Sequence, residues 1–439
     1  MKKIFTILAL LCSLQLFAQN NAPDWSRKST IYEVNIRQYT PEGTFSAFEQ
    51  HIPRLHDMGV DILWMMPVQP IGKLNRKGSL GSYYSISDYT ATNPEFGSLK
   101  DFKNLVDAAH KDNMHVILDW VANHTSWDHV WMKSHKEYYS TAKDGSVIPP
   151  VADWSDVADL NYDNADMRKA MIDAMKFWIT ETDIDGFRCD VAMMIPDDFW
   201  VEAFTELRKI KPDIFLLCEA EGPQFIKDGF NMGYAWNRHH TMNMIAQGKE
   251  KPAKLDSLIQ ADLKLFPEGS YFMNFTSNHD ENSWNGSEFE RMGDAAKAMA
   301  VLSATMPGML LIYSGQEVGM NKRLRFFDKD TINWLDDKNF TPFYKSLIEI
   351  KNANPPLWNG TYGGDYKYIP TTSGNVYCFS REKMGNKVIV LTNLSGRNQL
   401  VEIEGLSGKF TNSFTGKNRT FKSGKEISLG PWEYLVLTE

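Results

Sequence analysis

The sequence predicts an α/β fold: a closed (β/α)8 TIM barrel, with a short loop domain inserted after its third strand and a C-terminal all-β sandwich domain. Two observations predict it. Short apolar runs alternate with amphipathic segments from about residue 30 to residue 355, and this alternation stops near Leu357. Strand–helix alternation is typical of parallel βαβ units. Seven or eight such units in a chain of this length fit a closed barrel better than an open sheet.

Seven apolar runs are predicted as barrel strands, and a weaker run would supply an eighth. The seven runs are 31–36, 62–66, 116–118, 186–189, 214–217, 272–275 and 309–312, and the weak run is 230–236. The amphipathic segments between and after these runs predict helices at 98–113, 166–180, 197–209, 294–305 and 341–351.

Two parts of the chain depart from this alternation. Residues 124–163 are rich in polar and aromatic residues and contain Pro149-Pro150, which indicates a long insertion. Beyond residue 357, turns with glycine separate short alternating runs at 376–380, 387–393, 400–403 and 434–437, which predict β-strands. We therefore expect a barrel over 19–356, an inserted domain over 124–163 within it, and a β-sandwich over 357–439.

The N-terminal segment and the charge balance narrow the location and the partners. Lys2 and Lys3 precede the apolar run 4–18, which is too short to span a bilayer, so residues 1–18 are predicted to be a signal peptide. The protein is then exported, to the periplasm or the medium, without a transmembrane segment. A formal net charge of −8 and the lack of any basic run argue against a nucleic-acid partner.

Polar residues follow the predicted strands at the end where a barrel carries its active site. They are Asp119, Asn123 and His124 after the third strand, Arg188 and Asp190 at the fourth, Glu219 and Glu221 at the next, and Asn278, His279 and Asp280 after the run 272–275.

The spacing of three carboxylates suggests distinct chemical roles. Arg188 and Asp190 lie two residues apart and share one face of a strand, where a guanidinium favours an ionised carboxylate suited to a nucleophile. A structural ion pair at the barrel rim is the alternative. Glu219, crowded by Asp190 and Asp280, would have a raised pKa and could donate a proton. Glu221, on the same face, is the rival candidate.

Two chemistries fit this set of residues. One is glycosidic hydrolysis through an oxocarbenium-like transition state, which carboxylates stabilise. The other is a metal site built from Asp119, His124, His279 and Asp280. A metal hydrolase usually carries a closely spaced histidine pair, and the adjacent His239-His240 has the wrong spacing.

The motifs resemble those of the α-amylase family of retaining glycoside hydrolases, glycoside hydrolase family 13. Residues 119–124 match D-x-V-x-N-H, residues 186–190 match G-x-R-x-D, Glu219 falls at the acid of the fifth strand, and residues 278–280 match N-H-D. The resemblance implies that Asp190 is the nucleophile, Glu219 the general acid/base and Asp280 a stabiliser of the transition state.

The resemblance also implies roles for the residues around this triad. Arg188 would hold Asp190 ionised, His124 and His279 would hydrogen-bond the sugar, and Tyr84 would stack on its ring. Asn123 and Asp159 match positions that can ligate Ca²⁺ in the family. Met193-Met194 stand where calcium-dependent amylases commonly carry Lys-His, which is closer to neopullulanases and cyclodextrinases.

We therefore expect an exported retaining α-glucan hydrolase that cleaves α-1,4-glucosidic bonds in starch-derived poly- and oligosaccharides through a covalent glycosyl-aspartate. A cyclomaltodextrinase or neopullulanase, an α-glucosidase and a transglycosylase are alternatives that use the same site. A non-catalytic carbohydrate-binding member of the family is a further alternative. The presence of Asp190, Glu219 and Asp280 argues against it.

Overall fold

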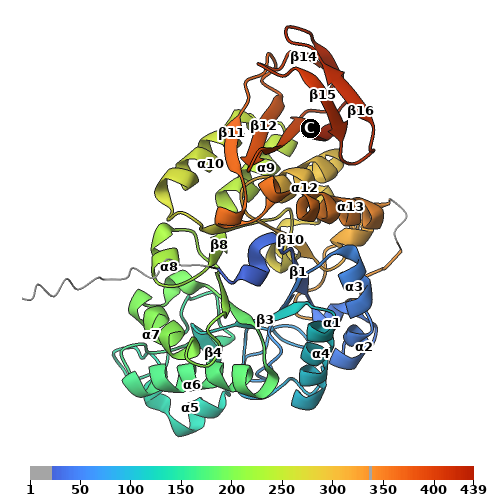
Figure 1. Ribbon diagram of the computed structural model, residues 1–439. Coiled ribbons are helices and arrows are strands. Elements are labelled where there is room, and N and C mark those ends of the chain that lie inside the picture. The colour runs from blue at the N-terminus through green and yellow to red at the C-terminus, as the bar shows by residue number, and fades with distance from the viewer. Residues whose placement is uncertain (1–21, 336–338) are drawn as a thin grey trace, which may run out of the picture.

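Eight parallel strands form a closed barrel in the computed structural model, which describes residues 22–335 and 339–439 (Figure 1). The strands follow one another around the ring in the order β1-β10-β9-β8-β7-β6-β3-β2. The predicted fold class is confirmed, and the weak run near residue 232 supplies β8. The predicted signal peptide, residues 1–18, lies outside the described residues. The barrel strands are β1 (Ile31–Val34), β2 (Ile62–Met65), β3 (His115–Trp120), β6 (Gly186–Cys189), β7 (Phe215–Cys218), β8 (Met232–Tyr234), β9 (Tyr271–Asn274) and β10 (Met309–Tyr313).

Helices between successive strands surround the barrel (Figure 1). They are α1 (Ile36–Tyr39), α2 (Phe45–Glu49), α3 (Ile52–Met58), α4 (Leu99–Lys111), α6 (Ala165–Thr182), α7 (Asp197–Leu207), α8 (Pro223–Lys227), α9 (Trp236–Ala246), α10 (Ala253–Leu265), α11 (Glu288–Met292), α12 (Ala296–Thr305) and α13 (Phe340–Ala353). The first strand is shorter than expected, because Ile36 already begins α1.

The strands are apolar on both faces because each face meets a different core. Ile31, Trp64 and Leu217 belong to the core inside the barrel. Their neighbours Tyr32 and Leu216 belong to the larger core between the strands and the helices. Alternate residues therefore enter two apolar environments, which is why these strands read as continuous apolar runs rather than as alternating ones.

The segment after β3 carries a small sheet of its own. Strands β4 (His124–Ser126) and β5 (Val157–Asp159) pair antiparallel, with His124 opposite Asp159, and α5 (Val130–Ser134) lies between them in sequence. This inserted segment rises beside the carboxyl ends of the barrel strands, since β4 begins only three residues after β3 ends.

The C-terminal region is all-β and packs on the barrel helices. A six-stranded sheet, in the order β11-β12-β13-β18-β15-β16, faces a two-stranded sheet of β14 and β17, and residues of both, such as Leu391 and Val401, share one core. Phe343 of α13 stacks on Phe414 and contacts Tyr434, so the region is joined to the barrel by apolar contacts. The strands are β11 (Asp365–Tyr368), β12 (Val376–Lys383), β13 (Asn386–Asn393), β14 (Gln399–Val401), β15 (Gly408–Asn412), β16 (Asn418–Phe421), β17 (Ile427–Leu429) and β18 (Tyr434–Thr438).

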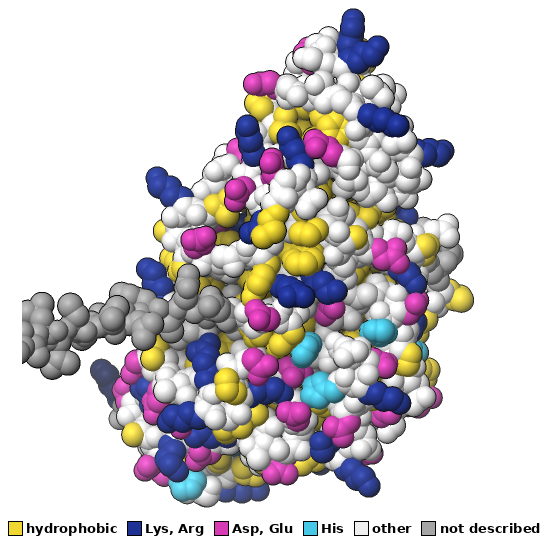
Figure 2. Space-filling model, viewed as in Figure 1, with side chains coloured by type: hydrophobic (Ala, Val, Ile, Leu, Met, Phe, Trp, Pro, Cys, Tyr) yellow, Lys and Arg dark blue, Asp and Glu magenta, His cyan; other side chains and the backbone are white. Residues whose placement is uncertain are grey.

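The surface carries charges of both signs. Figure 2 shows Lys and Arg side chains scattered among Asp and Glu over the visible face rather than gathered in a patch. Among the described residues, every helix is too short or too polar to cross a membrane.

Candidate active site

The predicted polar residues gather at the carboxyl ends of the barrel strands. Asp119 lies near the end of β3, Asp190 directly follows β6 and Glu219 directly follows β7. Strands β6 and β7 approach so closely that a Cβ on Gly186 would lie 1.9 Å from the carbonyl oxygen of Phe215. The glycine that opens β6 is therefore a packing requirement, and it places the residues that follow it against β7.

These residues line one cavity of about 520 Å³. Six of the seven residues predicted for catalysis or substrate binding border it, and the seventh, Arg188, lies beneath it without solvent exposure. The inserted segment and the loop after β10 complete the walls. The lining residues used below are Tyr84, His124, Asp190, Glu219, His279, Asp280, Trp154, Trp284, Phe326 and Phe327.

Arg188 joins the carboxylates beneath this cavity. Its Nη1 lies 2.8 Å from Oδ1 of Asp190 and 2.9 Å from Oδ1 of Asp119. Its Nη2 lies 3.0 Å from Oε2 of Glu219, and its Nε donates to the hydroxyl of Tyr234 over 3.1 Å. One fully buried guanidinium thus binds both carboxylates that the resemblance implies for catalysis, and it fixes their relative position.

Asp119 links Arg188 to an aromatic side chain of the site. Its Oδ2 accepts hydrogen bonds from the indole of Trp64 over 3.1 Å and from the hydroxyl of Tyr84 over 3.0 Å. With Arg188 on its other oxygen, Asp119 connects the guanidinium to the Tyr84 ring that borders the cavity. Asp119 is fully buried and does not line the cavity, which makes it a positioning group.

The pKa of Asp190 corrects one expectation. Burial raises the pKa of Asp190 to about 6, and the guanidinium of Arg188 opposes this shift without reversing it. Desolvation of the buried carboxylate outweighs the attraction of the guanidinium. Arg188 thus favours the ionised form of Asp190 as expected, but the net shift of the pKa is upward, and Asp190 is still mostly ionised at pH 7.

Glu219 has the environment expected of a proton donor. Burial raises its pKa to about 7, and the nearby charges of Asp190 and Asp280 add to the shift. Its Oε2 accepts from the backbone N–H of Val191 over 2.8 Å. The rival Glu221 instead accepts two hydrogen bonds from Asn237, both of 2.9 Å, and does not border the cavity.

His279 stands between three oxygen atoms. Its Nδ1 lies 2.5 Å from Oε1 of Glu33, and its Nε2 lies 2.8 Å from the hydroxyl of Tyr84 and 3.2 Å from Oδ2 of Asp280. Burial disfavours the imidazolium, but Asp280 and Glu33 outweigh burial and raise the pKa of His279 well above its ordinary value. Burial favours a raised pKa for Asp280 as well, but the positive charge of His279 outweighs burial, so the pKa of Asp280 is lowered.

His124 borders the same cavity in a different state. Burial lowers its pKa to about 4, with Asp156 and a backbone hydrogen bond to Tyr84 opposing, so the ring is neutral at pH 7. Its ring lies 5.5 Å from that of Trp154 in an edge-on arrangement. Nδ1 accepts from the amide of Asn123, so the proton of the neutral ring belongs on Nε2.

The residues predicted to bind calcium do not make a calcium site by themselves. Asn123 donates its amide to Nδ1 of His124 over 3.2 Å, and the carboxylate of Asp159 is hydrogen-bonded to Ser140. Calcium takes six to eight oxygen ligands, of which these two side chains supply a minority. In the part of the chain that is described, no three His, Cys, Asp or Glu residues gather as a metal site, so Asp119, His124, His279 and Asp280 form none either.

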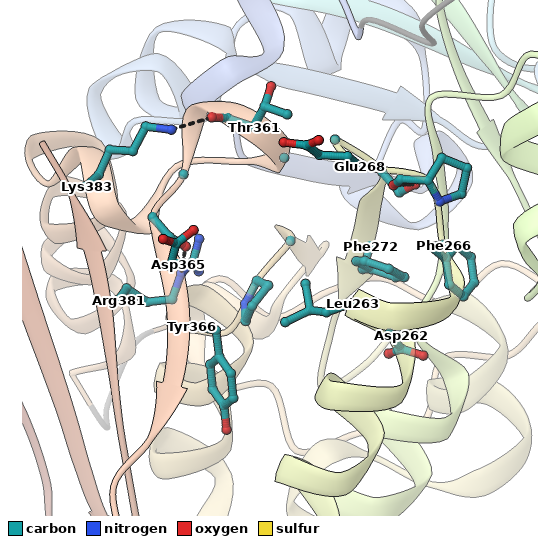
Figure 3. Close-up of a pocket in the computed structure, with 18 residues that line it drawn as sticks. Asp262, Leu263, Phe266, Glu268, Phe272, Thr361, Asp365, Tyr366, Arg381 and Lys383 are labelled. Carbon is teal, nitrogen blue, oxygen red and sulfur yellow. Dashed lines mark hydrogen bonds between the residues drawn. The ribbon is translucent and has the colours of Figure 1, made fainter. Parts of the chain in front are cut away.

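A second cavity, of about 500 Å³, lies where the C-terminal region meets the barrel (Figure 3). It is bordered by the segments that precede β9 and β10, and so lies at the amino ends of the strands. Three of its charged side chains already have partners: Lys383 donates to the carbonyl of Thr361, Arg381 to three backbone carbonyls, and Asp262 binds Arg238. The catalytic carboxylates lie at the opposite end of the barrel.

Sequence reasoning missed two parts of the site. Glu33 was not considered, although a single carboxylate within the apolar run Ile31–Val34 is the signal that could have found it. The aromatic wall formed by Trp284, Phe326 and Phe327 is the second part. The ring centroid of Trp284 lies 5.1 Å from that of Phe326 and 5.7 Å from that of Phe327, and both phenylalanines come from a loop that the sequence does not connect with Trp284.

Comparisons with known proteins agree with this geometry. The family model for the α-amylase catalytic domain matches residues 15–148 and 151–366. An α-amylase of Dictyoglomus thermophilum is 25% identical over 99% of this chain and 98% of its own length. An α-amylase of Haloarcula japonica is 27% identical over 85% of this chain, which spans 56% of that relative.

Solved structures extend the likeness to three dimensions. The crystal structure of an α-amylase from Lactobacillus plantarum superposes with a TM-score of 0.86 and 31% identity, covering 94% of this chain and 99% of that chain. A maltogenic α-amylase of Thermotoga neapolitana has the same TM-score at 27% identity, covering 94% of this chain and 98% of that one. The chain therefore belongs to the α-amylase family of glycoside hydrolases.

Proposed function

We propose that this protein is a retaining α-glucan hydrolase that cleaves α-1,4-glucosidic bonds by double displacement. The observation that carries the proposal is the single guanidinium of Arg188, which binds both Asp190 and Glu219 at the floor of one cavity. A nucleophile and an acid held side by side are what a retaining mechanism requires, because its two carboxyl groups lie only about 5–5.5 Å apart, whereas an inverting pair leaves room for a water molecule.

In the first step, Asp190 attacks the anomeric carbon while Glu219 protonates the departing glycosidic oxygen. Arg188 occupies Oδ1 of Asp190, which orients the carboxylate and leaves Oδ2 for the sugar. Oε2 of Glu219 is likewise bound by Val191 and Arg188, so the transferable proton belongs on Oε1. The products of this step are a glycosyl-aspartate ester and a glucan with a free hydroxyl.

In the second step, the now ionised Glu219 removes a proton from water, which attacks the anomeric carbon and releases Asp190. Asp280 stabilises the positive charge that develops on the sugar in both steps, and its lowered pKa keeps it ionised. His124 and His279 bind hydroxyl groups of the same sugar. Two inversions at one carbon restore the starting configuration.

The aromatic lining supports a glucan as the ligand. Trp284 is 52% exposed and borders the cavity, and its side chain also hydrogen-bonds Asp280. Tyr84 also borders the cavity and is stacked on His279 with ring centroids 5.4 Å apart. Exposed aromatic faces beside carboxylates suit pyranose rings, which present apolar C–H faces and hydroxyl edges.

Product analysis tests this proposal. Amylose, pullulan, cyclodextrin and maltose are supplied in parallel reactions, and NMR records the anomeric form of the products during the first minutes. We expect the initial products to be α-anomers. Attack on amylose in preference to the other three supports an α-amylase. Preference for cyclodextrin or pullulan would instead identify a cyclomaltodextrinase or a neopullulanase. Two relatives carry these names, a cyclomaltodextrinase of Thermoanaerobacter pseudethanolicus and a neopullulanase of Thermoactinomyces vulgaris.

The variant Asp190→Asn is the control for the mechanism. It removes the charge that must attack, so kcat should fall by roughly four orders of magnitude while the protein stays folded by circular dichroism. Initial products of β-configuration, or turnover by this variant close to that of the unmodified protein, would contradict a glycosyl-aspartate.

We also propose that the protein is exported to the periplasm or the medium, which the Lys2-Lys3 pair and the apolar run 4–18 support. Fractionation of cells expressing the chain with and without residues 1–18 tests this. Activity that stays in the cytoplasm with both forms would contradict export.

A further inference from the structure

A carboxylate inside the barrel faces the active site from below. Glu33 is the third residue of β1 and has no solvent exposure. It shares a face with Ile31, which belongs to the core inside the barrel, and its register partners on the two neighbouring strands are Trp64 and Tyr313. An ionised carboxylate in such a place costs several kcal/mol of desolvation unless a charged partner compensates for it.

The partner of Glu33 is His279. Nδ1 of His279 lies 2.5 Å from Oε1 of Glu33, so the two buried groups are in hydrogen-bond contact and can carry opposite charges. Among the described residues, the second oxygen of Glu33 has no hydrogen-bond partner, so the interaction with His279 is its main compensation. Removing either partner would leave the other buried without its counterpart.

The opposite side of the His279 ring is also surrounded by acceptors. The hydroxyl of Tyr84 donates to Asp119, so its oxygen can only accept from Nε2 of His279. Oδ2 of Asp280 lies 3.2 Å from the same nitrogen. Protons are therefore needed on both ring nitrogens at once, and only the imidazolium carries both.

The other charged and titratable groups near this pair were considered as well. Burial raises the pKa of Glu33, and His279 and then Arg188 of β6 oppose that shift by favouring its ionised form. The hydroxyls of Tyr234 on β8 and Tyr313 on β10 lie near Glu33 and stay protonated, since burial raises the pKa of both well above the ordinary value. Glu33, Asp280 and Asp119 are therefore the anions that balance His279 and Arg188.

We propose that Glu33 is a positioning residue of the reaction: it holds His279 as an imidazolium, whose Nε2–H then orients Asp280 and Tyr84. Through Tyr84 the effect reaches Asp119, and through Asp119 it reaches Arg188. Glu33 touches no substrate and acts one residue removed from the sugar. This role rests on the hydrolase function proposed above, whereas the protonation state of His279 can be measured without any substrate.

The substitution Glu33→Gln separates charge from shape. Glutamine keeps the size of the side chain and an oxygen that can accept from Nδ1–H, but it removes the negative charge. His279 can then lose its Nε2 proton. The unprotonated Nε2 would repel the carboxylate of Asp280. It would also accept the hydrogen bond that the Tyr84 hydroxyl donates to Asp119 in the unmodified protein.

Histidine ring ¹⁵N NMR of the folded protein provides the direct test, with His279 assigned from the spectrum of His279→Asn. In the unmodified protein we expect His279 to titrate well above the range of an ordinary histidine. In Glu33→Gln we expect its titration to move down by about one pH unit or more. The matched control is Glu288→Gln, another buried glutamate, which binds Gln316 and makes no contact with His279. Identical titration of His279 in Glu33→Gln and the unmodified protein would overturn the proposal.

Enzyme kinetics then test the link to the reaction. Relative to Glu288→Gln, the kcat of Glu33→Gln should fall by about tenfold at pH values above the lowered titration midpoint of His279 and should recover below it, with a smaller change in KM, because Asp280 acts on the transition state. A shifted His279 titration with an unchanged kcat profile would overturn the positioning role. Absence of glucan hydrolysis by the unmodified protein would refute the proposed function instead.

A second variant decides the question if Glu33→Gln does not fold. Asp280→Asn removes the other carboxylate beside His279 and leaves Glu33 in place. If Glu33 holds the imidazolium, His279 in this variant still titrates above the range of an ordinary histidine. A titration within or below that range would show that Asp280, and not Glu33, sets its charge.

Discussion

The acid and base chemistry of single residues predicts a narrow pH optimum. Burial raises the pKa of Asp190 to about 6 and that of Glu219 to about 7. Asp190 must be ionised to attack, so activity is lost as pH falls through about 6. Glu219 must be protonated to donate, so activity is lost as pH rises through about 7.

The plot of kcat/KM against pH should therefore be bell-shaped, with its maximum between about pH 6 and pH 7 and both limbs belonging to the coupled pair. Initial rates on an α-glucan in buffers of constant ionic strength measure it. A plateau that extends above pH 8 would contradict Glu219 as the acid.

The choice between Glu219 and Glu221 makes a second residue-scale prediction. Glu219→Gln should slow substrates with poor leaving groups by about two to four orders of magnitude, and an activated aryl glycoside much less, because such a leaving group needs little protonation. Glu221→Gln is the matched comparison, since Glu221 is bound by Asn237 away from the cavity. If Glu221→Gln shows the leaving-group dependence, the acid is misassigned.

At the scale of single residues, the sequence predicted which side chains gather at the site, but it predicted the directions of their pKa shifts only in part. The direction of the shift at Glu219 was expected, and that at Asp190 was not. Desolvation is the reason: spacing along a strand indicates which charges are neighbours, but burial of a group depends on residues far away in the sequence.

Among the elements, β6 carries the strictest requirement. A Cβ at Gly186 would lie 1.9 Å from the carbonyl oxygen of Phe215, so alanine there must push β6 away from β7. We expect Gly186→Ala to lower the free energy of unfolding by roughly 1–3 kcal/mol. Because β6 carries Arg188 and leads into Asp190, we also expect kcat to fall at least about tenfold.

Urea denaturation and steady-state kinetics measure the two effects. Gly374→Ala is the control, since a Cβ at Gly374 meets nothing within 4 Å and its backbone conformation suits other residues. If Gly186→Ala retained full stability and activity, the close approach of β6 and β7 would not be needed for the site.

The elements also show where sequence patterns are informative. All eight barrel strands were predicted, because strands buried on both faces read as apolar runs. In the C-terminal region, β11, β15, β16 and β17 were missed. Buried residues are a minority in each of these strands, as in Asn418–Phe421, where only Phe421 is buried. Pairing with neighbouring strands, rather than their own composition, makes them strands.

Across the whole molecule, the barrel and the C-terminal region share one core. Leu347 of α13 and Val436 of β18 belong to the same buried cluster as the residues around the barrel strands. We therefore expect the protein to unfold in a single transition rather than domain by domain.

Phe343→Ala tests this coupling, because Phe343 contacts Phe414 and Tyr434 across the junction. The loss of this ring should lower the free energy of unfolding by about 3 kcal/mol or more and keep one transition in calorimetry. Leu400→Ala, at a residue that is 62% exposed in the same region, should change little. Two separate transitions in the unmodified protein would contradict a shared core.

By itself the sequence determined the barrel, its β-rich C-terminal region, and the carboxylates and arginine at the strand ends. These follow from local patterns, since the apolar period and the residue that ends each strand are written along the chain. Only the tertiary structure decided that Glu33 lies under His279, that Phe326 and Phe327 stand beside Trp284, and that Asp119 joins Arg188 to Tyr84. These contacts join residues dozens to hundreds of positions apart, and closure of the barrel is what brings them together and removes the water that would screen their charges.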